Sequence, residues 1–320
     1  MGSYLLRRLL SIIPLVLILS LITFILLNEI GDPLSYYVQA NVAGADLERL
    51  TKSLGLDRPV IVRYLDWLKN IITGNWGNSL VTGRPVTDLI FERLPATLLL
   101  TGTAFLFTLI LAIPLGIYAA VNRNRLPDYL VSSFSLLAFS APTFWTGIMA
   151  IVIFSLQARK LDLPYLPSGG MYDLVEGPSV KSIAVHLILP ATILMLFSIA
   201  RYIRFMRSSM IDSLEQDFIR TARAKGLNER LVLYKHALRN SILPIVSLIS
   251  VDAPRLMAGA LITEQVFSWP GMGRLMVEHS MRADYPVLMG ILIIITLSVA
   301  VLSIVGDLIY VYIDPRIEYS

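Results

Sequence analysis

LPATLLLTGTAFLFTLILAIPLGIYAAV, residues 94–121, carries no charged side chain, and this stretch decides the fold class. A helix needs about 20 apolar residues to cross a hydrocarbon core of about 30 Å. Lipid offers the backbone no hydrogen-bond partner, so a segment that crosses it must pair its own amides by forming a helix. We therefore predict that residues 94–121 form a membrane-spanning helix.

Five further stretches have the same apolar character, and only the one at residues 241–263 contains charges, Asp252 and Arg255. The four uncharged stretches are residues 9–27, 129–157, 182–200 and 286–306. Apolar residues make up 55% of the 320-residue chain and charged residues only 16%, whereas soluble domains carry about 25% charged residues. The sequence thus predicts an all-α polytopic membrane protein with about six transmembrane helices.

Basic residues predict which ends of the spans face the cytoplasm, because Lys and Arg concentrate in cytoplasmic loops. Arg7 and Arg8 precede the first span, Arg316 follows the sixth, and residues 201–239 between the fourth and fifth are rich in Arg and Lys. Both termini are therefore predicted to be cytoplasmic. Residues 28–93 then form an extracytoplasmic insertion after the first span.

The insertion contains two stretches in which apolar residues recur at helical spacing. The first ends at Gly55, and the second begins near Asp57 and Pro59 and ends before Gly74, since Pro favours the start of a helix and Gly its end. The apolar positions are Leu47, Leu50 and Leu54 in the first stretch and Ile61, Leu65, Leu68 and Ile72 in the second. We expect two surface helices on the outer side of the membrane.

Several kinds of site are missing from the sequence. The chain has no cysteine, which excludes a disulfide framework and thiolate metal sites. No lysine follows a glycine, so the Gly-Lys of a phosphate-binding loop is absent. His186, His236 and His279 have no sequence neighbours at metal-ligand or triad spacing. The net charge of +4 gives no indication of nucleic-acid binding. A transporter, channel or scaffold fits better than a membrane enzyme.

The longest polar stretch that faces the cytoplasm, residues 217–240, carries the strongest functional signal. It contains FIRTARAKG, which predicts a short helix that stops at Gly226, and Asn228 can cap the next helix. Small side chains let a partner approach the backbone, apolar ones anchor it, and arginines pair with acidic groups. The candidate docking residues are Phe218, Ile219, Arg220, Ala222, Arg223, Ala224 and Gly226. The alternative is a basic loop held by anionic lipid headgroups.

This stretch resembles the coupling loop of ATP-binding-cassette importer permeases, in which Glu-Ala-Ala, three residues and Gly dock on the ATPase. Ala222 and Gly226 match, while Arg220 and Thr221 replace the Glu and the first Ala. The Thr-Ala-Arg-Ala-Lys-Gly form is similar to that of the dipeptide and oligopeptide branch, which also includes nickel permeases. Further stretches resemble the same branch in the same order, at residues 81–86, 92–97, 140–145, 200–204, 207–210, 264–273 and 284–286.

The resemblance implies a single transmembrane permease domain over residues 1–320, with a five-span core at 94–320 and a coupling loop at 208–240, in the inner membrane of a bacterium or archaeon. Its implied partners are a second homologous permease, two cytoplasmic ATPases coupled through residues 217–239, an extracytoplasmic substrate-binding protein and a peptide substrate. The chain would itself bind no cofactor and would not be an enzyme, since ATP and Mg would be held by the ATPases.

Two further features each allow two interpretations. Asp252 and Arg255 lie three residues apart on one helix face and can pair, either to line the pathway and meet the charged ends of a peptide or to pack two helices together. The last outer loop contains Trp269, Pro270, Gly271 and Gly273. It is predicted to be either a lid or contact for the binding protein, or a tight turn before a surface helix.

Other functions give different sequence expectations. A nickel or other small-solute importer of the same family remains an alternative, although no cluster of His or Met in the spans favours a metal. A secondary transporter driven by an ion gradient needs coupling carboxylates at mid-membrane and a repeat of broken helices. Asp252 is the one candidate carboxylate, and no repeat is evident in the sequence. A membrane scaffold would not need polar, proline-interrupted spans.

Overall fold

The computed structural model describes residues 2–30, 51 and 55–313, and within these it describes no side chain for residues 2–9, 30, 253–259 and 309–313. Every named element is a helix, and within the described ranges the one bridge between extended segments joins Asn78 and Pro85. The predicted all-α class is confirmed. The chain divides into two compact units, Met1–Ala96 with Pro270–Ala300 and Thr97–Trp269 with Val301–Ser320.

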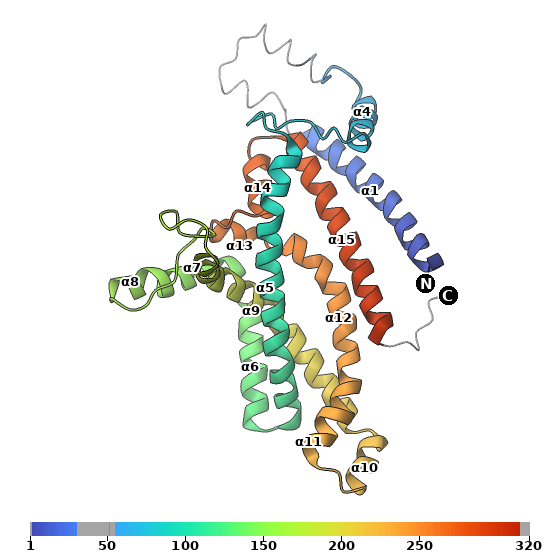
Figure 1. The fold of residues 1–320 in the computed structure, drawn as a ribbon, viewed down its shortest axis with the longest axis vertical. Helices are drawn as coiled ribbons and strands as arrows, with labels where there is room; N and C mark the ends of the chain where they lie inside the picture. Colours follow the sequence, from blue (N-terminus) through green and yellow to red (C-terminus); the bar gives the residue numbers. More distant parts are fainter. Residues whose placement is uncertain (1, 31–50, 52–54, 314–320) are drawn as a thin grey trace. The chain divides into compact units, whose positions relative to one another are not determined.

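The first unit packs helices from both ends of the chain. Its elements are α1 (Gly2–Ile30), α4 (Val60–Ile72), the first part of α5 (Val86–Val121), α14 (Met272–Ser280) and the first part of α15 (Tyr285–Ile313). Apolar residues of α5, α14 and α15 form its core, among them Ile90, Leu275 and Ile291. The helix α4 lies beside α1 (Figure 1) and confirms the second predicted surface helix, from its N-cap Pro59 to Gly74, whose φ is +86°. The first predicted surface helix lies outside the described residues.

The second unit is organised around α9 (Val180–Leu214), which packs against several other helices, three of them longer than eight residues and adjacent to it over much of their length. Those three are α6 (Leu126–Ser140), α7 (Thr143–Ile151) and α12 (Leu238–Gly259). At Gly116 in the second part of α5, a Cβ atom would lie 2.6 Å from the Cβ of Met206. Only glycine therefore allows α5 to approach α9 this closely.

Besides the last part of α15, the remaining elements of the second unit are short. They are η1 (Val152–Gln157), α8 (Ala158–Lys160), α10 (Asp217–Ala224), α11 (Glu229–Leu231), η2 (Val232–Ala237) and α13 (Leu261–Val266). The two η segments are π-helices that continue directly into α8 and α12. The route from α9 to α12 thus runs through α10, α11 and η2.

Four helices are long and apolar enough to cross a membrane: Leu10–Glu29, Val86–Val121, Val180–Leu214 and Tyr285–Leu308. They match the expected first, second, fourth and sixth spans. The expected fifth span falls largely on α12, whose residues 253–259 have no described side chain. The count of six spans therefore stays a prediction.

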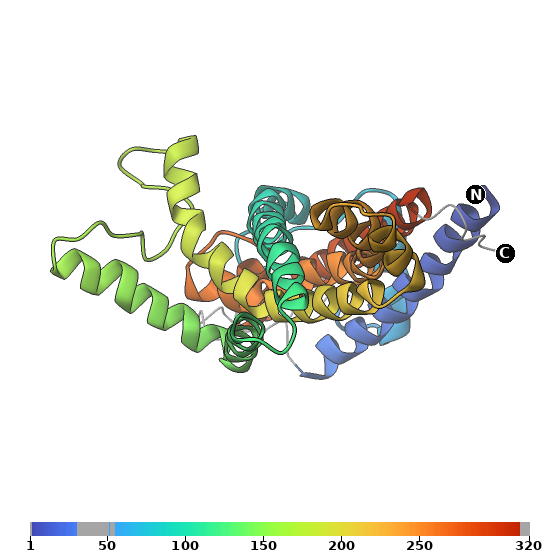
Figure 2. The same cartoon turned by 90° about the horizontal axis from the view of Figure 1, so that it is seen from below.

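The expected third span, residues 129–157, is broken and does not form one continuous helix. At Ala141 and Pro142 the chain bends by 97° between α6 and the segment Thr143–Lys160. Proline lacks an amide hydrogen and disfavours the helical conformation in the residue before it, and Ala141 is extended, with ψ at 132°. Figure 2 shows the segment that begins with α7 running across the direction of α6.

Candidate functional site

The predicted docking helix is present as α10, and its ends follow from the local sequence. Gly226 has a φ of +72°, its amide donates to the Arg223 carbonyl at 2.9 Å, and the Leu227 amide donates to Ala222 at 3.4 Å. A glycine in this left-handed conformation ends a helix at little cost. Asn228 then accepts a hydrogen bond from the Arg230 amide at 3.0 Å and caps α11. The predicted order of helix, glycine stop and second helix is confirmed.

One face of α10 is fixed inside the second unit. Ile219 and Ala222 are buried in the same core as Met210 of α9 and Val232 of η2. Residues three apart share a helix face, and this face is the one that packs inward. The prediction that Ile219 is an anchor for a partner is therefore wrong, and Ala222 does not offer its surface to a partner either. Both residues hold α10 against the helices on either side of it.

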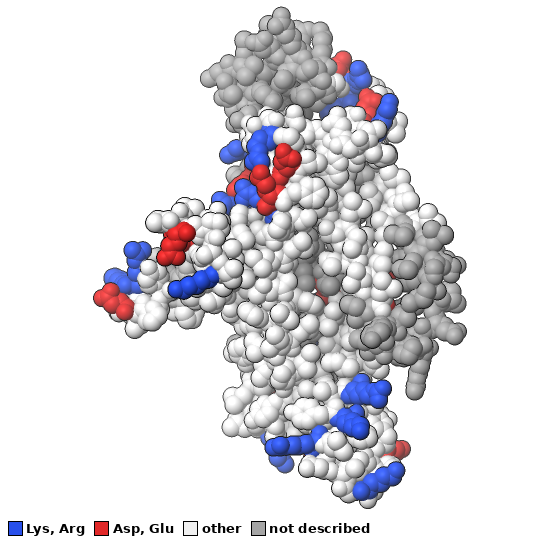
Figure 3. Space-filling model, in the orientation of Figure 1, with Lys and Arg blue, Asp and Glu red and all other residues white. Residues whose placement is uncertain are grey.

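The other face of α10 is open and basic. Phe218 is 40% exposed, and Arg220, Arg223 and Ala224 are exposed as well. Arg223 donates two hydrogen bonds to Glu229, at 2.5 and 3.2 Å, and these lower the pKa of Glu229 and raise that of Arg223. Figure 3 shows basic side chains gathered around the end of this unit formed by α10 and α11. The exposed face thus offers one aromatic anchor among guanidinium groups.

Asp252 forms an ion pair that spacing in the sequence does not predict. Its carboxylate lies 2.5 Å from Nη1 of Arg201 on α9, with 13% of the Asp252 side chain and 42% of Arg201 exposed. Both residues line a cavity of about 160 Å³, together with the aromatic residues Phe139 and Tyr202. The expected pairing of Asp252 with Arg255 is not tested, because the Arg255 side chain lies outside the described residues. The pair with Arg201 joins α12 to α9 across 51 positions of sequence.

A second ion pair joins α9 to α6. Asp128 accepts hydrogen bonds from Nε and Nη2 of Arg207, at 2.6 and 2.7 Å. Between the two pairs, the Arg204 guanidinium lies 5.8 Å from the centre of the Phe139 ring. Arg201, Arg204 and Arg207 are spaced by three, so they follow one side of α9. From the sequence these arginines indicate only the orientation of the span, because the acidic partners of Arg201 and Arg207 are 51 and 79 positions away.

The tryptophan of the last outer loop is not exposed on the surface. Trp269 is fully buried, and its amide donates to the Glu264 carbonyl at 2.8 Å. The prediction that Trp269 faces outward as a lid or contact is therefore wrong, since a large aromatic side chain gains most from removal from water. Pro270 and Gly273 are half-buried, and Gly271 precedes α14. The alternative, a turn that leads into a helix, agrees with this arrangement.

His279 has an acidic partner five positions along the chain, a spacing typical of neither a metal site nor a catalytic triad. Its Nδ1 lies 2.8 Å from Oδ2 of Asp284. The Ser79 hydroxyl also donates to Oδ2, at 2.5 Å, and the Leu80 amide donates to Oδ1 at 3.1 Å. Burial alone would raise the pKa of Asp284, but the hydrogen bonds together outweigh burial and lower it. In a hydrolase triad the imidazole lies between serine and acid, whereas here the carboxylate lies between, so the cluster is structural.

Two family descriptions and several curated proteins match this chain over almost its whole length. Residues 112–319 match the family described as binding-protein-dependent transport system inner membrane component, and residues 1–101 match the N-terminal region described for such membrane components. The chain is 37% identical to the oligopeptide transport system permease protein AppB of Bacillus subtilis, with 100% of both chains covered. It is 41% identical to a putative peptide permease protein of Brucella ovis and 35% identical to the glutathione transport system permease protein GsiC of Escherichia coli, again with 100% of both covered.

A solved structure shares the fold. A chain of the MetNI methionine ABC transporter, in an inward-facing conformation, superposes with a TM-score of 0.56 at 16% identity, covering 70% of this chain and 96% of that one. A second crystal form of the same transporter gives a TM-score of 0.55 at 14% identity, covering 71% and 97%. At this identity the likeness concerns the fold alone.

Proposed function

We propose that this chain, which belongs to the family of binding-protein-dependent transport system inner membrane components, is a permease subunit. It would span the membrane as part of an ATP-driven peptide importer. Relatives at 35–41% identity are named for oligopeptides, peptides and glutathione, which supports peptides as the cargo. These names favour a peptide importer over a nickel importer or an ion-driven transporter. The chain would work in the inner membrane, with both termini in the cytoplasm.

The chain's partners would supply the energy and the substrate. Two cytoplasmic ATPases would bind ATP and Mg, a second homologous permease would complete the pathway, and an extracytoplasmic binding protein would deliver the peptide. This chain has no Gly-Lys pair of a phosphate-binding loop, so the nucleotide must act through contact with the permease. Other components of the transporter are therefore required for its activity.

The observation that carries the proposal is the two-sided construction of α10. Its exposed face, with Phe218 and Arg220, would dock on the ATPase, while its buried face, with Ile219 and Ala222, is fixed to the core that α9 and η2 share. A movement of the ATPase would thus reach two membrane helices at once. ATP can shift the conformational balance only if it binds one state more tightly, and α10 is where that preference would reach this chain.

The pathway candidate is the cavity beside Arg201 and Asp252. Charged side chains inside a membrane face protein or water, since exposure to lipid costs about 2.5–3.5 kcal/mol on insertion scales. Arg201 remains 42% exposed although it is paired, which leaves part of its guanidinium available to a passing carboxylate. We propose that this pair, rather than Asp252 with Arg255, meets the charged ends of the peptide.

Reconstitution tests the proposed function. The chain is co-expressed with its neighbouring permease and ATPases, and the purified complex is placed in vesicles with the binding protein outside and ATP inside. We expect accumulation of a labelled peptide that stops when a non-hydrolysable nucleotide replaces ATP. Uptake of the peptide by this chain alone, or uptake that follows an imposed ion gradient and ignores ATP, would contradict the proposal.

A further inference from the structure

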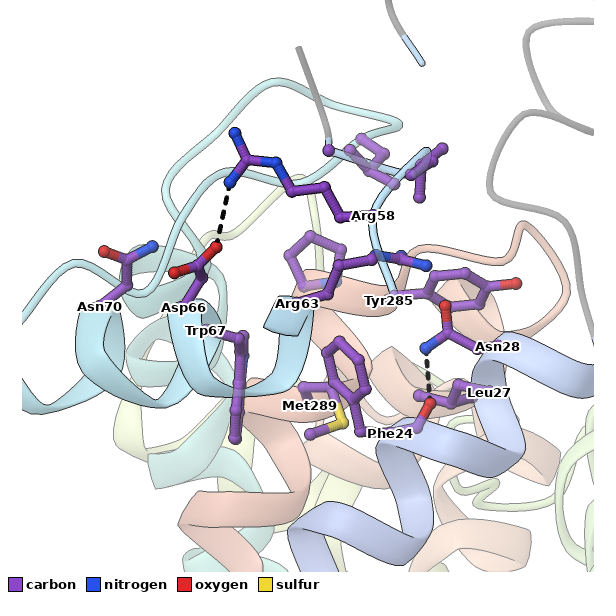
Figure 4. A pocket seen from close by; sticks show the side chains of 14 residues that line it. Phe24, Leu27, Asn28, Arg58, Arg63, Asp66, Trp67, Asn70, Tyr285 and Met289 are labelled. Carbon is purple, nitrogen blue, oxygen red and sulfur yellow. Dashed lines mark hydrogen bonds and ion pairs between the residues drawn. The ribbon is translucent and has the colours of Figure 1, made fainter. Parts of the chain in front are cut away.

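A pocket of about 330 Å³ lies in the first unit where two apolar spans end (Figure 4). The first span ends at Glu29 and the last begins at Tyr285. Phe24 and Leu27 of α1, Met289 of α15 and Trp67 of α4 give the pocket apolar walls. Because both spans leave the hydrocarbon here, the pocket lies at the depth of the lipid headgroups, whichever side of the membrane it faces.

Arg63 is a cation in this pocket without an acidic partner among the residues that the structure describes. It is half-buried, and its guanidinium lies 5.8 Å from the centre of the Phe24 ring. Burial lowers its pKa, since removal from water disfavours the charged form. Arg58, on the rim of the same pocket, is paired with Asp66 at 3.3 Å. Among the described residues that line the pocket, two arginines and one carboxylate leave a net positive charge that an anion would neutralise.

The wall that carries Arg63 is held firmly against α1. The Tyr64 hydroxyl donates to the Leu17 carbonyl at 3.1 Å, and the Tyr64 ring lies edge-on to Phe24 with centroids 5.6 Å apart. Trp67 stacks on Tyr64 at 5.7 Å. These contacts hold the turn of α4 that carries Arg63 against α1 before any ligand arrives, which reduces the entropy lost on binding.

The opposite side of α4 is apolar and uncovered by the described part of the chain. Ile61 and Leu65 are more than half exposed, and Ile72 is 77% exposed. A soluble surface helix would direct such a stripe inward. A helix that lies in the membrane interface buries the stripe among acyl chains, with aromatic and basic residues at headgroup level. The helix α4 therefore has the composition of an interfacial helix fixed to the end of a span.

We propose that this pocket binds a phospholipid, with its phosphodiester on Arg63 and an acyl chain along Phe24, Leu27 and Met289. The occupant is a lipid because the cation lies at the end of two spans and because the walls below it are apolar. A guanidinium forms strong, charge-assisted hydrogen bonds with phosphate oxygens. Trp67 and Tyr285 are of the aromatic types that line the headgroup region. The bound lipid would fasten α4 to the membrane surface.

Native mass spectrometry of the purified transporter complex tests this proposal. Phosphatidylglycerol is titrated into the complex, and the occupancy of one tightly bound lipid is compared between the wild type, Arg63→Gln and Lys69→Gln. We expect Arg63→Gln to reduce the affinity for that lipid by about tenfold, which is the effect of losing one charged hydrogen bond. Lys69→Gln is the matched control, because it removes a positive charge from the same helix outside the lining of the pocket, and lipid binding should stay within about twofold of the wild type.

Two soluble ligands and one neutral lipid identify the occupant. Glycerol 3-phosphate and inorganic phosphate should fail to displace the lipid at equal concentration, and diacylglycerol, which lacks the phosphate, should fail to bind. Equal lipid retention in wild type and Arg63→Gln would overturn the proposal, as would saturation of the site by glycerol 3-phosphate alone. If Arg63→Gln does not assemble, a photoreactive phosphatidylglycerol is used with the wild type. Labelling of α4 supports the site, and labelling that omits α4 overturns it.

Discussion

Asp128 and Arg207 form a bidentate ion pair that fixes α6 to α9. The two hydrogen bonds measure 2.6 and 2.7 Å, and only 4% of the Asp128 side chain is exposed. The Asn124 amide donates a third hydrogen bond to the same carboxylate at 2.9 Å. Seven residues beyond Arg207 α9 ends at Leu214, and α10 follows. The pair therefore holds the helix that leads into the proposed docking segment.

Replacing Asp128 with Asn should destabilise the protein strongly. Loss of one partner from a buried pair leaves the other charge uncompensated, at a cost of about 3 kcal/mol. Thermal unfolding of the purified complex should show a clearly lower midpoint for this variant. Glu215→Gln is the matched control, because it breaks the exposed pair with Arg123 and should cost less than about 1 kcal/mol. Equal shifts for the two variants would contradict this account of the pair.

The two faces of α10 should respond differently to substitution. Phe218→Ala should leave thermal stability near that of the wild type but reduce recovery of the ATPases with the permease, because it removes the exposed anchor. Ile219→Ala should cost about 2–5 kcal/mol of stability, because it opens a cavity in the core shared with α9 and η2. Co-purification and thermal unfolding separate the two effects. If both variants still bind the ATPases as the wild type does, docking through α10 is contradicted.

Local features of this fold follow from local sequence. Gly226 predicts the end of α10, Pro59 and Gly74 bracket α4, and the uncharged stretches predict four of the apolar spans. Pro142 predicts an interruption but not a bend of 97°, because the angle depends on what packs beside the break. Likewise, the spacing of Ile219 and Ala222 indicates a shared face, but only tertiary packing decides that this face points inward.

The charged contacts could not be predicted for a different reason. Sequence spacing reports which residues share one helix face, whereas the acidic partners of the arginines lie on other helices. Arg201 and Asp252 are 51 positions apart, Arg207 and Asp128 are 79 apart, and Ser79 and Asp284 are 205 apart. Burial of an acid in a membrane protein demands a partner, and spacing in the sequence offers only Arg255 for Asp252, whereas Arg201 comes from another helix.

Acid should weaken the first unit through Asp284. The pKa of this carboxyl is lower in the folded protein than in the unfolded chain, where it is about 3.9. Its stabilising contribution is therefore fully present above about pH 4 and is lost as the pH falls through the folded pKa. Thermal unfolding between pH 3 and pH 6 should show a steeper loss of stability in the wild type than in Asp284→Asn. Parallel profiles would show that Asp284 is not the group responsible.

Charge reversal distinguishes the two roles open to Arg201 and Asp252. The single variants Arg201→Asp and Asp252→Arg should each assemble poorly, because each places like charges side by side. The double variant restores an ion pair, so a pair that only packs α9 against α12 should recover both assembly and uptake. If instead Arg201 meets the carboxylate of the peptide, the double variant should assemble but transport free-acid peptides about tenfold more slowly. Uptake into vesicles of matched peptides with free and amidated C-termini measures this difference. Wild-type uptake of both peptides by the double variant would exclude the pathway role and leave helix packing as the function of the pair.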